Sequence, residues 1–243
     1  MPYVDHQHVN AFGGLYTSAS FSDEFQAKTY KGLPHYTVVA GRKKLATASI
    51  AGILDSTTTI STAITHSAIT SVTVGGAGKA VEGVLTSLSL SGKKADVINF
   101  SLEVKGKTAT PPSSTPAPGT LAMLEDATIT VGSNQLSVLE FSLNASWDVE
   151  FVWGSDVYPT VADTIFKSFD GTLSVRLNAA PNLSDTLSEV SFSIEVSLGT
   201  NKTLSITGKA YETTQTAEDT PDDLYKTTRE FTISELSIQT VTQ

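Results

Sequence analysis

Two histidines come closest to a metal-binding pattern in this chain. His6 and His8 stand two residues apart beside Asp5, and this spacing places both imidazoles on one face of an extended strand. A zinc site needs three or four ligands held on rigid elements, whereas residues near a chain end are usually poorly ordered. We therefore interpret this segment as a surface tail and predict no metal-binding residues.

Catalytic and phosphate-binding motifs would need spacings that the sequence does not contain. His35 and His66 lie in separate Thr-rich segments without an obvious carboxylate partner, and no Gly-x-Ser-x-Gly elbow is present. The segment 75–79 places glycines before a lysine, but the spacing of a phosphate loop is not met, and Lys79 is followed by Ala80. A glycine hairpin explains this stretch better. The sequence predicts no catalytic and no cofactor-binding residues, and a protein that is not an enzyme.

The charged clusters are short and favour solvated turns over ligand sites. Asp219, Asp222 and Asp223 have the chemistry of calcium ligands, but Pro221 interrupts them and the ordered Asp-x-Asp-x-Asp-Gly loop is missing. The basic segments 42–44 and 93–94 are candidate phosphate contacts. A nucleic-acid-binding domain is usually basic overall, whereas this chain has a net charge of −9. We interpret the basic segments as charged turns at the ends of sheet strands.

Two tryptophans raise the possibility of a carbohydrate-stacking surface. Trp147 and Trp153 are six residues apart, so they share one face of a strand, and Tyr158 follows nearby. The same face also carries Val149 and Phe151, which favours packing in a core. A carbohydrate-binding or adhesin-type β-sandwich therefore stays as the alternative function.

Composition predicts an all-β protein. Ser and Thr are abundant, charged residues make up only 17%, and alternating apolar and polar residues recur along the chain. Cysteine is absent, which excludes disulfides, thiolate metal sites and a cysteine nucleophile. The first residues lack the basic and apolar regions of a secretory signal, and no apolar run reaches the roughly 20 residues of a membrane span. We expect a protein made in the cytoplasm, with no membrane partner.

A pattern of acid, alternating apolar and polar residues, then Glu-Val divides the chain into two modules. It occurs at 96–104 and again at 189–196, with the proline-rich segment 110–119 between the two. We predict a first β module over 1–109, a linker over 110–119 and a second β module over 120–243, all antiparallel sandwiches or barrels.

Three segments carry more specific expectations. Val161, Ile165, Phe166 and Phe169 have helical spacing, so 160–169 is the predicted helix, with Thr160 as a possible cap. The segment 57–71 reads as a loop with a short helix, and 213–224 as a long acidic loop.

The charge of the chain is unevenly distributed. Residues 1–117 carry 10 Lys and Arg against 7 Asp and Glu, a net charge of +3. Residues 118–243 carry 6 against 18, a net charge of −12. Such a division is compatible with head-to-tail contact between unlike halves of neighbouring copies, or with an acidic half that is simply solvated.

At the level of pattern, the chain resembles the tail tube (major tail) proteins of long-tailed bacterial viruses. The resemblance rests on a strand ending in Gly52-Ile53-Leu54-Asp55 and on the closing hairpin over 83–106. The second half, with its expected helix at 160–169 and its ending in Lys209-Ala210-Tyr211 and an acidic loop, is similar to another copy. It spans most of the chain and includes no catalytic residue.

The resemblance implies a self-assembling virion protein. Its strands would join across neighbours into trimeric rings of pseudo-sixfold symmetry or into hexameric rings, stacked into a tube. Viral DNA would pass through the bore without specific binding, and the acidic half could line that bore. The implied partners are other copies and the tail terminator, tape measure and distal tail proteins. Segments 57–71 and 210–228 are the candidate contacts between subunits or rings.

Overall fold

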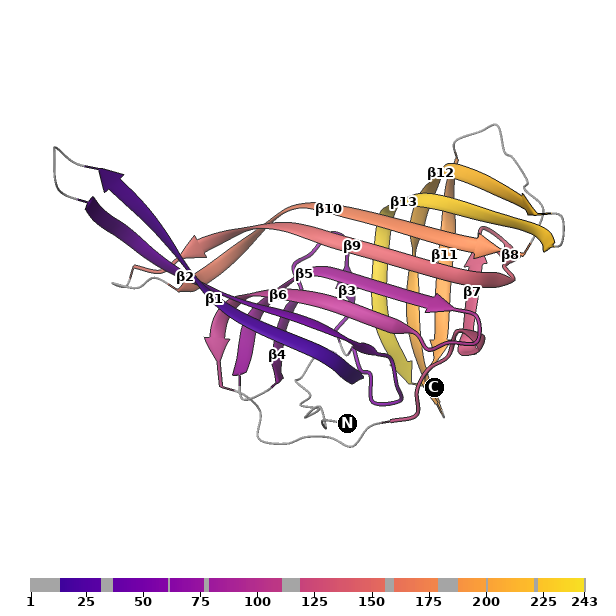
Figure 1. The fold of residues 1–243 in the computed structure, drawn as a ribbon, viewed down its shortest axis with the longest axis horizontal. Helices are drawn as coiled ribbons and strands as arrows, with labels where there is room; N and C mark the ends of the chain where they lie inside the picture. The colour runs from indigo at the N-terminus through magenta and orange to yellow at the C-terminus, as the bar shows by residue number, and fades with distance from the viewer. Residues whose placement is uncertain are drawn as a thin grey trace.

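The prediction of an all-β protein is confirmed by a computed structural model. It describes residues 14–31, 37–60, 62–76, 79–110, 119–155, 160–178, 188–199, 201–220 and 223–242. These residues form one antiparallel sheet of 13 strands (Figure 1), with a single 3-10 turn, η1 (Leu124–Asp126). The strands are β1 (Leu15–Lys31), β2 (Thr37–Ile53), β3 (Ile64–Thr65), β4 (Ser71–Gly76), β5 (Lys79–Lys93), β6 (Asn99–Ala109), β7 (Ala127–Val131), β8 (Asn134–Gln135), β9 (Val138–Trp153), β10 (Val161–Leu177), β11 (Glu189–Ser197), β12 (Lys202–Thr220) and β13 (Asp223–Thr242).

The order of the strands repeats a five-strand unit. In the first unit the neighbours run β1-β2-β6-β5, and β4 pairs with the far side of β5. In the second unit they run β9-β10-β13-β12-β11. The short β3 lies off this path and is not counted in the first unit. In each unit the first two strands of the unit form a hairpin, and its fifth, fourth and third strands follow in that order. All neighbours are antiparallel. The duplication inferred from sequence has a counterpart in the topology.

The two units join edge to edge without a break in the sheet. The second part of β5 pairs with β9, in a register that runs from Ser87 opposite Ser146 to Lys93 opposite Glu140. The predicted module boundaries at 109/110 and 119/120 stay a prediction, and most of the linker (111–118) lies outside the described residues.

The repeated sequence stretches do not occupy equivalent positions. The stretch at 96–104 leads into β6, between β2 and β5, whereas the stretch at 189–196 is β11, between β12 and β7. By topology the counterpart of β6 is β13. An alternating pattern marks any half-buried strand of an antiparallel sheet, so it cannot identify which strand of a repeat is which.

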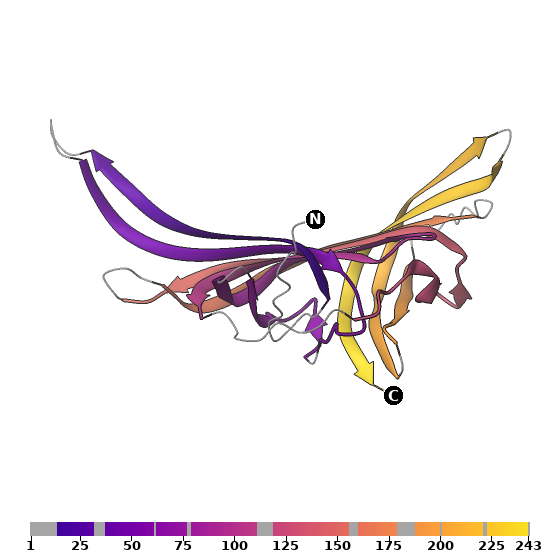
Figure 2. The same ribbon diagram turned by 60° about the horizontal axis from the view of Figure 1, so that its bottom comes forward.

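One face of the sheet carries the core, because the long sheet bends back over itself. Figure 2 shows the strands of β1, β2, β9 and β10 as one layer, with β3, β4 and the lower parts of β11, β12 and β13 on its other side. Side chains from both units meet there, among them the fully buried Ile50, Leu90, Phe141, Ile194 and Phe231. The same view shows the β1–β2 and β12–β13 hairpins rising from opposite ends of the body.

The predicted helix at 160–169 is wrong. Val161–Leu177 forms the strand β10, paired with β9 from Trp153 to Val138. Two register shifts, between Val161 and Asp163 and between Phe166 and Ser168, place Val161, Phe166 and Phe169 on the core side of β10. Each bulge inserts one extra residue, so side chains return to one face at intervals other than two. Ile165 lies on the other face, opposite Glu150, and is 46% exposed.

Other local expectations also change. The segment 57–71 contains no helix among its described residues and includes β3, which pairs with β13. The expected loop at 213–224 consists of the ends of β12 and β13, with Thr220 opposite Asp223. Residues 42–44 lie inside β2 and do not form a turn.

Candidate functional site

The exposed face of the sheet is built from small uncharged polar side chains. One row crosses five strands from Ser18 in β1 through Ala51, Ser101 and Ser89 to Asn144 in β9, each residue directly opposite the next. The row continues from Asn144 to Thr172 in β10 and Thr232 in β13. We call this surface the bare face. Its residues alternate along each strand with the core residues, which is why the two faces differ so sharply.

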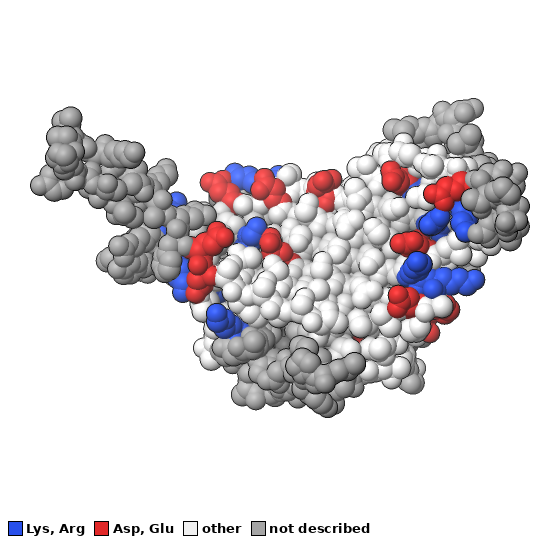
Figure 3. All heavy atoms as spheres, in the orientation of Figure 1, with Lys and Arg blue, Asp and Glu red and all other residues white. Residues whose placement is uncertain are grey.

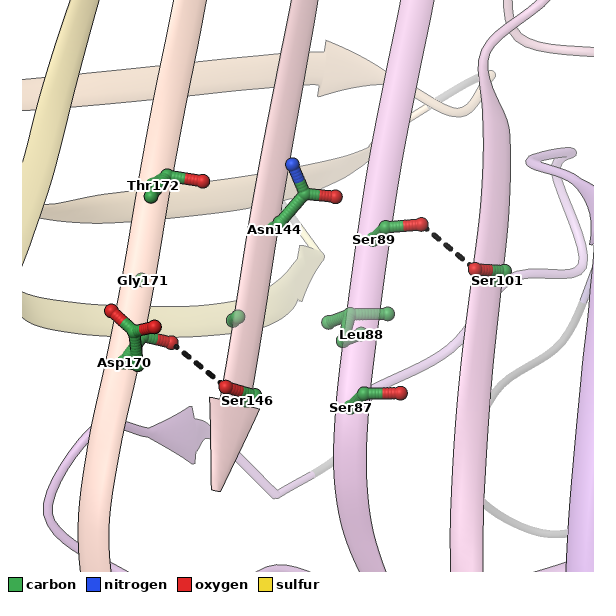
Figure 4. A pocket seen from close by; sticks show the side chains of 10 residues that line it. Ser87, Leu88, Ser89, Ser101, Asn144, Ser146, Asp170, Gly171 and Thr172 are labelled. Carbon is green, nitrogen blue, oxygen red and sulfur yellow. Dashed lines mark hydrogen bonds between the residues drawn. The ribbon is translucent and has the colours of Figure 1, made fainter. Parts of the chain in front are cut away.

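A close view of the bare face shows side chains that bond to one another across the strands. The Ser89 and Ser101 hydroxyls lie 2.8 Å apart, and the Ser146 hydroxyl donates to the Asp170 carbonyl (Figure 4). These residues line a shallow depression that includes Ser87 and Thr172. Most of its lining is hydroxyl and amide, and the exposed Asp170 adds one carboxylate at its margin.

Charged side chains lie towards the margins of this face. Figure 3, in the same view as Figure 1, shows an uncharged centre with acidic and basic groups towards the two ends. Glu103 is an exception within the rows: Thr86 donates to it at 2.9 Å and Lys105 pairs with it at 2.8 Å. Burial raises the pKa of Glu103, but the Lys105 and Thr86 hydrogen bonds outweigh it, so its pKa lies below the usual value.

The first strand of the sheet has an open edge. Within the described residues β1 pairs only with β2, at one end of the strand order. Residues 17–20 and 22–24 are exposed. Ala19 lies on the core side of the sheet, opposite the buried Ile50, and is nevertheless exposed. An uncovered core-side position is what a missing neighbouring strand leaves behind.

A second open edge lies along the end of β12. The first part of β12 pairs with β11 as far as Tyr211 opposite Glu189. Beyond this point, residues 212–220 pair with β13 on one side, and no described strand pairs with them on the other. Residues 213, 214 and 216–218 are exposed.

Acidic side chains near both open edges are paired within their own chain. The Arg229 guanidinium donates twice to Glu212, at 2.8 and 2.6 Å, and Arg176 pairs with Glu218. On β1, Asp23 pairs with Lys44 at 3.1 Å. These pairs reduce the charge that either edge presents to an approaching strand.

Asp55 is a buried residue whose hydrogen bonds help to hold the two halves of the chain together. It has no exposed surface, and its carboxylate accepts from Thr57 N at 2.8 Å and from Gly119 N at 2.9 Å. Lys202, at the start of β12, donates to the Ser56 carbonyl at 3.1 Å. Burial lowers the pKa of Lys202, while the nearby Asp55 carboxylate opposes that shift. Asp55 is the last residue of the Gly-x-x-Asp segment. Its structural role, which is to accept hydrogen bonds from backbone groups in a buried position, was not assigned from the sequence.

The segment 57–71 is likewise held by the second half. Ile60 N donates to Thr240 Oγ1 at 2.7 Å, and Thr240 N donates to the Ile60 carbonyl at 3.1 Å. His66 Nδ1 accepts from Leu236 N at 3.1 Å and its ring meets Phe169 edge-on. His66 therefore has a structural contact. Whether 57–71 also touches another copy stays a prediction.

The two tryptophans differ in burial and in their contacts. Trp147 is buried and its indole N–H donates to the Thr65 carbonyl at 2.9 Å, so the expectation of core packing is confirmed for it. Trp153 is half-buried with Lys43 Nζ 5.1 Å above its ring. Tyr158 lies outside the described residues. Trp147 is thus unable to stack on a sugar at the surface.

The other residues considered as ligands or phosphate contacts form no binding site among the described residues. Gly75 and Gly76 pair with Ala80 and Lys79, so the glycine hairpin is confirmed. His6, His8, Asp5, His35 and Asp222 lie outside the described residues, as do the side chains of Asp219 and Asp223. Across the described part of the chain, no group of three or more His, Asp or Glu side chains is arranged to hold a metal ion. No helix in that part is long and apolar enough to cross a membrane.

Sequence reasoning missed the open edges. The signal that was present is the Ser- and Thr-rich composition of 17–22 and 213–216 at positions that belong to strands. Comparison with known proteins adds no identification: no protein-family model matches the chain, and no curated protein matches it.

Proposed function

We propose that this protein is a structural subunit that assembles with copies of itself into rings, and that the rings stack into the tail tube of a bacterial virus. The observation that carries the proposal is the five-strand unit, present twice and joined edge to edge. Within the described residues, one open edge lies along β1, at one end of the strand order, and a second lies along residues 212–220 of β12. A contact between unlike edges is heterologous, and repeated heterologous contacts generate closed rings or filaments.

The bare face supports an assembly that encloses a passage. A ring closed through strand edges places one face of the sheet inside and the other outside. The core side carries β3, β4, β7 and the connections around Asp55, which makes it the bulkier side. The bare face, with its small side chains, fits the inside of the ring.

The chemistry of the bare face suits DNA that passes without binding. Binding to the phosphate backbone depends on Lys and Arg, and the central rows of this face have none. The passage would be lined mainly by hydroxyls and amides. This replaces the acidic lining expected from charge alone, since the acidic groups lie towards the margins.

One chain supplies two units, so three copies would supply the six units of a pseudo-sixfold ring. The tail terminator, tape measure and distal tail proteins remain the partners that the family resemblance implies. No observation favours the carbohydrate-binding alternative, because Trp147 is buried.

Electron microscopy of the purified protein tests the proposal. Negative-stain images would be recorded across a concentration series, with mass measured in solution at each step. We expect rings or hollow tubes, and the number of units per ring distinguishes three copies from six. A monomer throughout the series would overturn the proposal.

A further inference from the structure

The pairing of β5 with β9 inside the chain shows how two copies of the chain could pair through their open edges. At this junction between the two units, β5 uses its first part to pair with β4 and its last seven residues, 87–93, to pair with β9. In the same way β12 uses its first part to pair with β11, and its last part, 212–220, extends beyond that pairing. The strand that corresponds to β9 in the first unit is β1, whose outer edge is open. The chain thus displays one completed junction and both halves of a second.

We propose that residues 212–220 of one copy pair antiparallel with β1 of a second copy. This inference rests on the proposed assembly and names the strands that make its contact. The sheet then continues from one molecule into the next, as it does from β5 to β9 within the chain. Pairing of strand edges is a common mode of protein association, because each edge presents unpaired N–H and C=O groups.

The faces of the two edges match. On the bare side, β12 presents Thr214 and Thr216 and β1 presents Ser18 and Ser20, which continues the rows of hydroxyls. On the core side, Ala217 lies opposite the buried Thr227, and Ala19 lies opposite the buried Ile50. Pairing the strands with like faces together would cover Ala19 and Ala217, both of which are exposed in the single chain.

Ion pairs within the chain neutralise part of the acidic charge on these edges. Glu212 and Glu218 on one edge and Asp23 on the other have basic partners within the chain, and the exposed Glu24 adds a further carboxylate on β1. The attraction therefore comes from backbone hydrogen bonds and from covering small side chains. Each backbone hydrogen bond adds only modestly to the net free energy of association, so we expect the contact to form in a concentration-dependent way.

The absence of cysteine from the sequence allows a direct test by disulfide cross-linking between full-length chains. One protein would carry Ala217→Cys or Thr216→Cys, and the other a single cysteine at one of the positions 18–22. The two are mixed, oxidised and analysed by mass spectrometry. Directly opposite residues of antiparallel strands have Cα atoms about 4.5–5.5 Å apart, which is compatible with a disulfide.

The proposal predicts an alternating pattern. Ala217→Cys should cross-link to odd positions, Ala19→Cys or Phe21→Cys, and Thr216→Cys to even positions, because successive side chains point to opposite faces. Ser133→Cys, at an exposed position in the turn between β7 and β8 and outside both edges, is the control and should not cross-link. We expect the favoured pairs to exceed this control by at least about tenfold, since disulfide geometry tolerates little displacement.

The outcomes separate this inference from the proposed function. Rings seen by microscopy without mixed cross-links, or with links that do not alternate, would overturn the strand pairing and leave the assembly intact. Links between two Ala217→Cys copies in place of mixed links would indicate a symmetric contact and also overturn it. A failure of wild-type protein to assemble at any concentration would count against the proposed function itself.

Discussion

The completed junction and the open edges have the same architecture but different side chains. Where β5 meets β9, the core side pairs Leu90 with Leu143 and Leu88 with Ala145, all of them buried. Along the open edges, the core-side positions include Glu212, Gln215 and Ala217 on β12 and Ala19 on β1, with the half-buried Phe21 of β1 packed against the core. The apolar pairs make the first junction a permanent part of the core. Small and polar side chains suit edges that are exposed to water.

This difference would allow one topology to serve both folding and the proposed assembly. An exposed edge of large apolar residues is an aggregation hazard, and the exposed positions of 17–24 and 213–218 are Ser, Thr, Ala and acidic residues. The bare side shows no such contrast: Ser87 pairs with Ser146 at the junction, and Ser and Thr occupy the equivalent face of the open edges. Only the core side distinguishes a junction within the chain from the edges proposed to meet between chains.

The largest effect is expected from removing an apolar pair at the completed junction. Leu143→Ala would leave a cavity beside Leu90 and should lower the free energy of unfolding by about 2–5 kcal/mol. Asn144→Ala, one residue away on the bare face, should change it by less than about 0.5 kcal/mol. Chemical denaturation of both variants measures the difference. Equal effects would show that the junction is not the apolar core described above.

A smaller loss of stability is expected from removing the buried carboxylate of Asp55, which holds the two halves through polar contacts. Asp55→Ala would leave Thr57 N and Gly119 N without their buried acceptor, at a cost of about 1–3 kcal/mol. The Thr62→Ala variant, at an exposed position of the same segment, serves as the control. Hydrogen exchange would report the loss as faster opening of 54–60 and 119–122. A variant as stable as wild type, with unchanged exchange, would show that Asp55 does not hold the halves together.

The comparison also shows what the sequence reveals and what it hides. Alternation and the Thr- and Ser-rich composition were enough to predict an all-β protein, whereas the two-module division stays a prediction. They were not enough to place 160–169, because two bulges in β10 put Val161, Phe166 and Phe169 on one face at irregular intervals, and Ile165 lies on the other face. A bulge depends on the partner strand, and the sequence does not show which strand that is.

The open edges could not be predicted from the sequence either, because they also depend on which strands are paired. Nothing in 212–220 taken alone says that only one of its two sides is paired, since strand partners are contacts between distant residues. The role of Asp55 was hidden in the same way, because its partner Gly119 lies 64 positions away. Its local signature was readable: an acid followed by Ser and Thr favours a turn closed by side-chain hydrogen bonds.

The smallest effect is expected on the bare face, where both kinds of junction look alike. Glu103 has a pKa below its ordinary value, so its contribution to stability is present above the unfolded-state pKa and is lost as pH falls through the folded-state pKa. Glu103→Gln should therefore be less stable than wild type at pH 7, by no more than about 1 kcal/mol because solvent screens the pair with Lys105.

The difference between Glu103→Gln and wild type should shrink as pH falls to about 3, below the usual pKa of a glutamate. Urea denaturation at several pH values measures it, with Ser101→Ala as a neighbouring change that removes no charge. A gap that stays constant with pH would mean that the carboxylate contributes through packing alone. The rows of hydroxyls would then accommodate a charge at position 103 without gaining stability from it.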